Sequence, residues 1–193
     1  MKKEKQETIK RLKKYERKKE KSNFLWVLEI TMIAMVISFT FSFGSETILP
    51  NANVLVGILL VVIFIFMGIL FDMIGVAVTT ASETPFHSMS AQKIKGAKVA
   101  IKLKLNADKV SSFCNDVIGD ICGIISGSAG TIVARSVASS IHTDPFFTTL
   151  IITSVIAGLT IGGKALGKKL AINKSNMILY EFAKTISLVY RPQ

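Results

Sequence analysis

The sequence predicts an all-α protein, an integral membrane helical bundle of four transmembrane helices with amphipathic helices at the cytoplasmic interface. Half of its 193 residues are hydrophobic, and its mean hydropathy is +0.48 although it carries 24 lysines and arginines. This composition is typical of a membrane protein with charged ends. Four apolar stretches are each long enough to span a bilayer, and they cover residues 25–43, 54–80, 114–138 and 146–163. They leave no room for a separate soluble domain, so we expect a basic segment over 1–23 and one transmembrane domain over 24–193.

Apart from Arg135, the basic residues lie in three groups that alternate with the predicted spans. Eleven fall within 2–21, six within 93–109 and six within 164–191, while the connections 44–53 and 139–145 contain none. Because lysine and arginine gather on the cytoplasmic side of a membrane, this alternation predicts four crossings with both termini in the cytoplasm, and we expect the cell (plasma) membrane. The net charge of +11 then reflects the membrane topology of the chain, and no nucleic-acid partner is expected.

The first two elements are the basic segment 1–23 and the span 25–43. The segment is rich in lysine and glutamate and lacks the cleavage site of a signal peptide, so we expect a mature segment that binds anionic lipid headgroups. The span opens with Trp26, an interfacial anchor, and holds Glu29 one turn inside. Glu29 could face the bundle, but its shallow depth favours a side chain that snorkels to the interface.

The second span, 54–80, leads into a stretch that carries Asp72 and Glu83. If the helix continues to Pro85, a step of about 100° per residue places both carboxylates on one face with small residues. The residues on that face are Gly68, Asp72, Gly75, Thr79 and Glu83. Ionisable groups at membrane depth normally point into a bundle and mark an ion path. The alternative is that Asp72 marks the cytoplasmic end of the span and Glu83 lies in water beyond it.

The third span, 114–138, begins with Asn115, Asp116 and Asp120. The same helical step places the two carboxylates on one face with glycines at four-residue spacing, which are Gly119, Gly123 and Gly127. Such glycines let another helix approach closely, from the same chain or from a second copy. Two carboxylates at this seam would repel each other unless they were protonated, ion-paired or neutralised by a cation. The alternative is that Asp116 and Asp120 lie near the cytoplasm and cap the start of the helix. This alternative is weaker for Asp120, which lies deeper in the span.

The oxygen donors of these two faces suit a hard cation such as Mg²⁺. We expect the ligands, direct or through water, to be Ser82, Glu83, Asn115, Asp116 and Asp120, with Asp72 next to them or in a vestibule. The cysteine and histidine spacings predict no zinc site. The sequence contains no nucleophile motif and no phosphate-binding loop, so it does not predict an enzyme.

Two further segments predict amphipathic helices in the cytoplasmic membrane interface. One covers 92–104, where basic and apolar residues alternate, and its lack of aromatic platforms favours lipid over single-stranded nucleic acid. The other is a juxtamembrane helix over 165–189. It follows the fourth span, which we expect to end at Gly162, Gly163 and Lys164.

Three short motifs of this chain match those of a known family in their order and spacing along the sequence. Ser82-Glu83-Thr84-Pro85 is close to Ser-Glu-Thr-Ala, the segment from Cys114 to Asp120 is a loose match to Gly-Asn-x-x-x-Asn, and Gly163 to Lys168 stands in the place of Gly-Glu-x-x-Pro-Lys. In these motifs the chain, from about Val54 to Val189, resembles the transmembrane domain of the cyclin M (CNNM) and CorB/CorC magnesium transporters.

The resemblance implies a homodimer that transports Mg²⁺ or Co²⁺. Pro85 replaces the family's alanine, Lys164 reverses the charge of its glutamate, and Gly167 replaces its proline. The first span is additional to the family's three-helix core. Many members continue into paired CBS nucleotide-binding domains, and nucleotide control of this chain would require another polypeptide.

The sequence therefore supports two main hypotheses. In the first, the protein binds or moves a divalent cation through its acidic, glycine-rich helix faces. In the second, it is a non-transporting partner or regulatory subunit of another membrane protein, and its acidic residues pair with lysine or arginine to fix the helix register. A third hypothesis, a small pore-former of the holin kind, fits the size but not the motifs.

Overall fold

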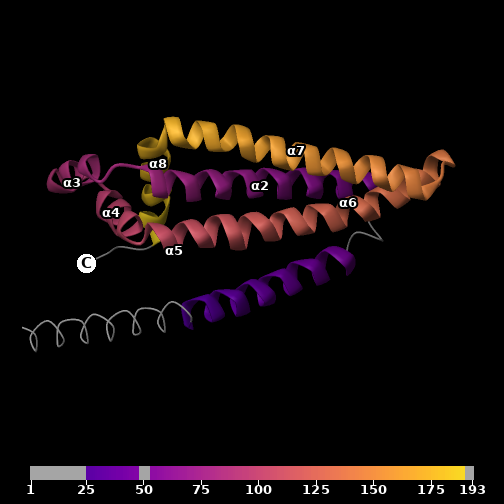
Figure 1. Cartoon of the computed structure of the whole chain (residues 1–193), viewed down its shortest axis with the longest axis horizontal. Coiled ribbons are helices and arrows are strands. Elements are labelled where there is room, and N and C mark those ends of the chain that lie inside the picture. Colours follow the sequence, from indigo (N-terminus) through magenta and orange to yellow (C-terminus); the bar gives the residue numbers. More distant parts are fainter. Residues whose placement is uncertain (1–24, 48–52, 190–193) are drawn as a thin grey trace, which may run out of the picture. The chain divides into compact units, whose positions relative to one another are not determined.

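The structure is a computed structural model that describes residues 25–47 and 53–189, and these residues form helices and no strand (Figure 1). A helix over Leu25–Thr47 comes first. It is followed by α2 (Val54–Thr80), α3 (Thr84–Ala91), α4 (Ala97–Leu105), α5 (Ala107–Ser112), the π-helix η2 (Phe113–Gly119), α6 (Asp120–Ile141), α7 (Pro145–Asn173) and α8 (Ser175–Val189). The all-α class predicted from the sequence is confirmed. The basic segment 1–23 lies outside the described residues.

Four helices in the described part of the chain are long and apolar enough to cross a membrane, and they are Leu25–Thr47, Val54–Thr80, Ala107–Ile141 and Pro145–Asn173. Helix α2 coincides with the predicted span over 54–80. The third and fourth helices extend beyond the predicted 114–138 and 146–163, because hydropathy locates the apolar part of a helix but not its polar continuation.

The chain divides into two compact units, residues 1–37 and 38–193. The described part of the first unit is the beginning of the helix Leu25–Thr47, on which the Glu29 side chain is exposed. The second unit contains α2 to α8, and the site described below lies entirely within it.

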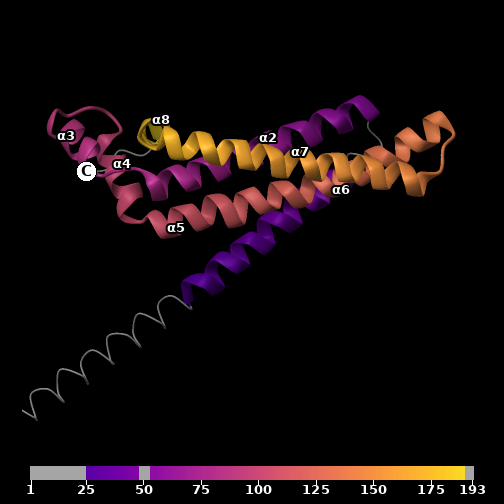
Figure 2. The same ribbon diagram turned by 45° about the horizontal axis from the view of Figure 1, so that its top comes forward.

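Helices α2, α6 and α7 form a three-helix bundle in which each packs against the other two (Figures 1 and 2). Glycines allow the close contacts. A Cβ atom added to Gly68 of α2 would lie 3.4 Å from the backbone oxygen of Gly119, and one added to Gly167 of α7 would lie 2.7 Å from Cγ of Met73. Gly119 therefore contributes to helix packing within the chain. A Cβ atom added to Gly123 or Gly127 would meet no other atom within 4 Å, so these two glycines face open space in this chain.

The same contacts explain why α7 passes the point where the sequence predicted an end. Gly163 packs against Ile69 of α2, so this glycine marks a helix crossing rather than a terminus. The juxtamembrane helix predicted over 165–189 is correspondingly wrong at its start, because α7 runs to Asn173 and α8 begins only at Ser175. For the segment predicted as a helix over 92–104, the structure has the helix α4, which begins later, at Ala97, and ends at Leu105.

At one end of the bundle, α4 and α8 pack on α2 and α3 packs on α4, and we call this the short-helix end (Figure 1). Its core contains Val78, Phe86, Ala100 and Leu179, each at most 1 % exposed. Apolar burial of this kind contributes roughly 1.5 to 3 kcal/mol per large side chain. The short helices are therefore held to the bundle by a core of their own.

Helix α2 ends at Thr80, and Ala81 has extended backbone angles. The condition under which Glu83 would share a helix face with Asp72, a helix that continues to Pro85, is therefore not met. Pro85 lies in the first turn of α3, where its missing N–H is harmless, but in a continuous helix it would break the bond to Ala81 and clash with the preceding turn. The freed backbone is satisfied from elsewhere, since the amide of Ser82 donates to Oδ1 of Asn176 at 2.8 Å.

Lys104 closes the end of α2, because its Nζ donates to the carbonyl oxygens of Thr79 at 2.7 Å and Val78 at 3.2 Å. A cation at a helix C-terminus also interacts favourably with the helix dipole. We expect Lys104→Met to lower the free energy of unfolding by about 1 kcal/mol, measured by thermal unfolding in detergent. Lys169→Met, at an exposed position on α7, is the matched control and should change stability by less than about 0.5 kcal/mol. Equal losses in the two variants would contradict the capping role.

Candidate cation site

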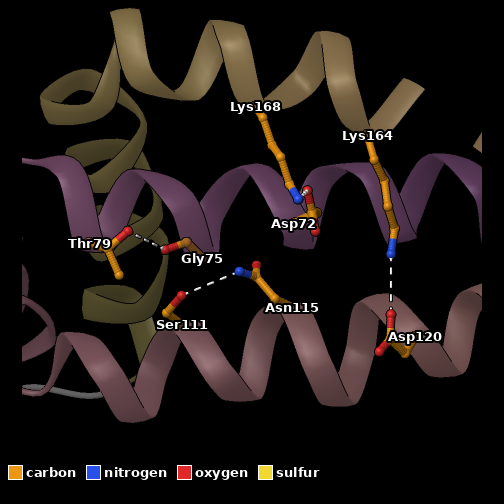
Figure 3. Close-up of polar contacts among 8 residues, drawn as sticks. All are labelled: Asp72, Gly75, Thr79, Ser111, Asn115, Asp120, Lys164 and Lys168. Atoms are coloured by element: carbon orange, nitrogen blue, oxygen red, sulfur yellow. Dashed lines mark hydrogen bonds and ion pairs between the residues drawn. The ribbon is translucent and has the colours of Figure 1, made fainter. Parts of the chain in front are cut away.

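The π-helix η2 places Asn115 against α2. The amide of Asn115 occupies the space that a side chain on Gly75 would fill, since a Cβ added there would lie 2.6 Å from Cγ of Asn115. Nδ2 of Asn115 donates to Oγ of Ser111 at 3.3 Å (Figure 3). Oδ1 of Asn115 is buried and accepts no hydrogen bond in the described part of the protein. A π-helical turn within a longer helix is frequently found at a functional site.

Asp72 lies one turn before Gly75 on the same helix and is 3 % exposed. Its Oδ2 atom is 3.8 Å from Nζ of Lys168 on α7 and, like Oδ1 of Asn115, accepts no hydrogen bond from the described residues. In this part of the chain these two oxygens are the buried side-chain atoms that lack a hydrogen-bond partner. Oδ1 of Asn115 lies at the contact between η2 and α2, and Oδ2 of Asp72 lies one turn earlier on α2, facing Lys168 of α7.

A second ion pair joins α7 to α6 one helical turn away. Nζ of Lys164 is 3.4 Å from Oδ1 of Asp120 (Figure 3). The two pairs differ in burial, because the Asp120 side chain is 66 % exposed and the Asp72 side chain 5 %. The Lys164 pair therefore resembles a surface ion pair, whereas the Lys168 pair neutralises a buried charge.

The structure brings together some of the predicted ligands and separates others. Asp72 and Asn115 both lie where α2 packs against neighbouring helices, Asp72 beside Lys168 of α7 and Asn115 against Gly75. Asp116 and Asp120 are exposed beside this contact, while Gly119 between them is buried. The sequence predicted that Asp116 and Asp120 share a helix face with Gly119, and this expectation is not met. The π-helix changes the angular step over 113–119, and the 100° step no longer applies there.

Ser82 and Glu83 lie beyond the end of α2 and are exposed. The helical residues from Asp72 to Thr80 alone span about 12 Å, so neither side chain joins the group at Asp72. Within residues 25–47 and 53–189, no three histidine, cysteine, aspartate or glutamate side chains form a group that could hold a metal ion. A cation at Asp72 would accordingly be held by one carboxylate, the amide oxygen of Asn115 and water.

Sequence reasoning did not find Lys164 and Lys168 as the partners of the two aspartates. Their spacing of four residues, which places both on one face of a largely apolar helix, was the available signal, because lysines at membrane depth are costly and face a partner. The π-helical geometry of η2 had no comparable signal in the sequence.

No protein-family model matches this sequence, and no curated protein matches it. The likeness to the cyclin M and CorB/CorC transporters therefore consists of the three motifs and their order. A function for the chain has to be argued from the chemistry of Asp72, Asn115 and the side chains around them.

Proposed function

We propose that the protein binds or moves a divalent cation, Mg²⁺ or Co²⁺, through the membrane, and that Asp72 and Asn115 are its innermost ligands. The observation that supports this proposal is the pair of buried oxygens, Oδ2 of Asp72 and Oδ1 of Asn115, that lack hydrogen bonds within the described residues. Buried polar atoms are normally satisfied, and an exception indicates water, an ion or a functional role. A bound, partly hydrated cation would satisfy both atoms.

The chemistry of the two ligands suits Mg²⁺. Carboxylate and amide oxygens are hard donors, and Mg²⁺ typically keeps several waters, so that one or two protein ligands are sufficient. Asp72 lies eight residues before the end of a 27-residue apolar helix, and an ionisable group at such a depth is usually functional. Lys168 balances the charge of Asp72 while no cation is bound.

The remaining predicted ligands have peripheral roles in this proposal. Asp116 and Asp120, exposed on the neighbouring helix, and Ser82 and Glu83, at the short-helix end, provide negative charge and oxygen donors that raise the local cation concentration. The basic groups at the short-helix end favour a cytoplasmic position for it, in the plasma membrane. Gly123 and Gly127, open in this chain, suit the packing of a homodimer.

One observation favours the second hypothesis, a non-transporting partner or regulatory subunit. Lys168 and Lys164 each compensate one aspartate, and the two pairs together would fix the register of α7 against α2 and α6. If these two ion pairs have a purely structural role, they require no bound cation. This protein would copurify with a stoichiometric second protein, and cations would not affect its stability.

Thermal unfolding of the detergent-purified protein in the presence of Mg²⁺, Co²⁺, Ca²⁺ or Na⁺ tests the proposal. We expect Mg²⁺ at 100 times its Kd to stabilise the wild type by about 2.7 kcal/mol. Asp72→Asn should abolish this effect, because an amide replaces the carboxylate. Asp108→Asn, an exposed position at the start of α5, is the control and should retain it.

The absence of any Mg²⁺ or Co²⁺ effect up to millimolar concentration would contradict the cation site and favour the partner hypothesis. An equal response to Na⁺ would contradict a specific divalent site. Where Mg²⁺ binds, flux into proteoliposomes then distinguishes a protein that moves the ion from one that only binds it.

A further inference from the structure

The short-helix end contains a cavity of about 650 Å³, lined by the turn between α3 and α4 and by the last turn of α8. Ligand sites in proteins commonly have volumes of about 300 to 1,000 Å³. Ten residues line this cavity, and three of them, Lys93, Lys95 and Lys98, are basic while none is acidic. It lies apart from Asp72 and Asn115, which do not line it.

The three lysines of this cavity are available to a ligand. Each is exposed, and none of the three side chains makes an ion pair or hydrogen bond with another described residue. Three cations around one cavity, with no acidic residue in its lining, favour a phosphate group. Helix α4 begins at Ala97, and the residue before it, Gly96, has no side chain to cap the first amides, so this helix start adds to the attraction of an anion.

The same cavity has an apolar side. Ile94 and Leu188 line it, and Leu188 is 82 % exposed. No aromatic side chain that could stack on a nucleobase lines it. Phosphate recognition next to exposed aliphatic side chains matches an amphiphile whose headgroup is charged and whose glycerol and acyl parts are apolar.

The position of the cavity along the bundle points to the same class of ligand. It lies at the short-helix end, where the apolar parts of α2 and α7 finish (Figure 1). The ends of membrane-spanning helices lie near the lipid headgroups of one leaflet or the other. Each lysine close to an anionic membrane surface contributes about 1 kcal/mol of attraction. We propose that this cavity binds the headgroup of an anionic phospholipid through Lys93, Lys95 and Lys98, with the apolar part of the lipid against Ile94 and Leu188.

The shape of the cavity is set by the backbone around it. Lys93 and Gly96 both have positive φ values, of 57° and 87°, so the chain reverses tightly between α3 and α4. A Cβ added to Gly96 would lie 2.9 Å from Cα of Lys184, which shows that the start of α4 is seated directly on α8. Lys93 and Lys95 are therefore carried by a turn, and Lys98 by the start of α4, that are fixed on the packed helix α8.

The test uses the full chain, purified in neutral detergent, and native mass spectrometry with short-chain phosphatidylglycerol or phosphatidylcholine. We expect the wild type to bind phosphatidylglycerol in preference to phosphatidylcholine. The double variant Lys95→Gln/Lys98→Gln should bind phosphatidylglycerol at least roughly tenfold more weakly, since it removes two of the three charges. The double variant Lys169→Gln/Lys174→Gln, which changes the net charge equally outside the cavity, should bind it as the wild type does.

A second variant tests the cavity without changing its charge. Ala91→Trp places a large side chain at the lining and should weaken phosphatidylglycerol binding while it preserves all three lysines. Equal binding of both lipids, or equal losses in the two lysine double variants, would overturn the proposal. Competition by glycerol 3-phosphate or inorganic phosphate at the lipid's own concentration would assign the cavity to a soluble phosphate and overturn the lipid assignment.

Discussion

Lys168→Met is expected to lower the free energy of unfolding by about 3 kcal/mol and to make the stability of the protein depend on Mg²⁺. Asp72 is 3 % exposed, and the ammonium group of Lys168 is the cation that the structure places beside it. Removal of one partner of a buried ion pair leaves an uncompensated charge, which costs about 3 to 5 kcal/mol, and the partial exposure of Lys168 favours the lower value. If Asp72 is a cation ligand, Mg²⁺ should replace the missing ammonium group and restore the stability.

Two control variants accompany this measurement, again by thermal unfolding with and without Mg²⁺. Lys164→Met breaks the neighbouring pair, but Asp120 is 66 % exposed, so the loss should be below about 1 kcal/mol. Asp72→Asn/Lys168→Met removes both charges and should recover most of the stability without responding to Mg²⁺. If Lys168→Met were destabilised but Mg²⁺ did not rescue it, the pair would be structural, as the partner hypothesis requires.

Hydropathy predicted the spans because lipid contact imposes a long apolar run whatever the packing. Helix α2 accordingly begins and ends where the sequence placed it. The end of α7 was mistaken, because Gly162 and Gly163 were taken as the end of the span. In the bundle Gly163 is a point where α2 approaches, which depends on the partner helix and has no local signature.

For the candidate site, the sequence identified Asp72 and Asn115 but could not rank them above Glu83. Their importance follows from burial, and burial depends on which helices meet. The pairing of Asp72 with Lys168 joins residues on two different helices, and no periodicity in the sequence encodes it. The rotation of Asn115 toward Gly75 similarly depends on the π-helix, for which a uniform helical step gives the wrong angle.

Gly96→Ala is expected to lower the free energy of unfolding by about 3 kcal/mol, measured by thermal unfolding. Two costs combine at this position. Alanine at a φ of 87° is in the left-handed region, which costs about 1 to 2 kcal/mol for a residue with a Cβ. The new Cβ would also lie 2.9 Å from Cα and 3.1 Å from the amide nitrogen of Lys184, and a backbone contact yields less readily than a flexible side chain. Forced overpacking of this kind costs about 1 to 3 kcal/mol.

Two further glycine variants separate these costs. Gly96→Asn keeps the steric conflict but tolerates the left-handed conformation, so it should lose about 1 kcal/mol less than Gly96→Ala. Gly158→Ala, within α7, is the matched control, because a Cβ there meets nothing within 4 Å in this chain and alanine favours the helix by about 0.5 to 1 kcal/mol. If Gly96→Ala were as stable as the wild type, α4 would not be seated on α8 at Lys184. The lysines of the proposed lipid cavity would then lose the fixed turn that holds them together.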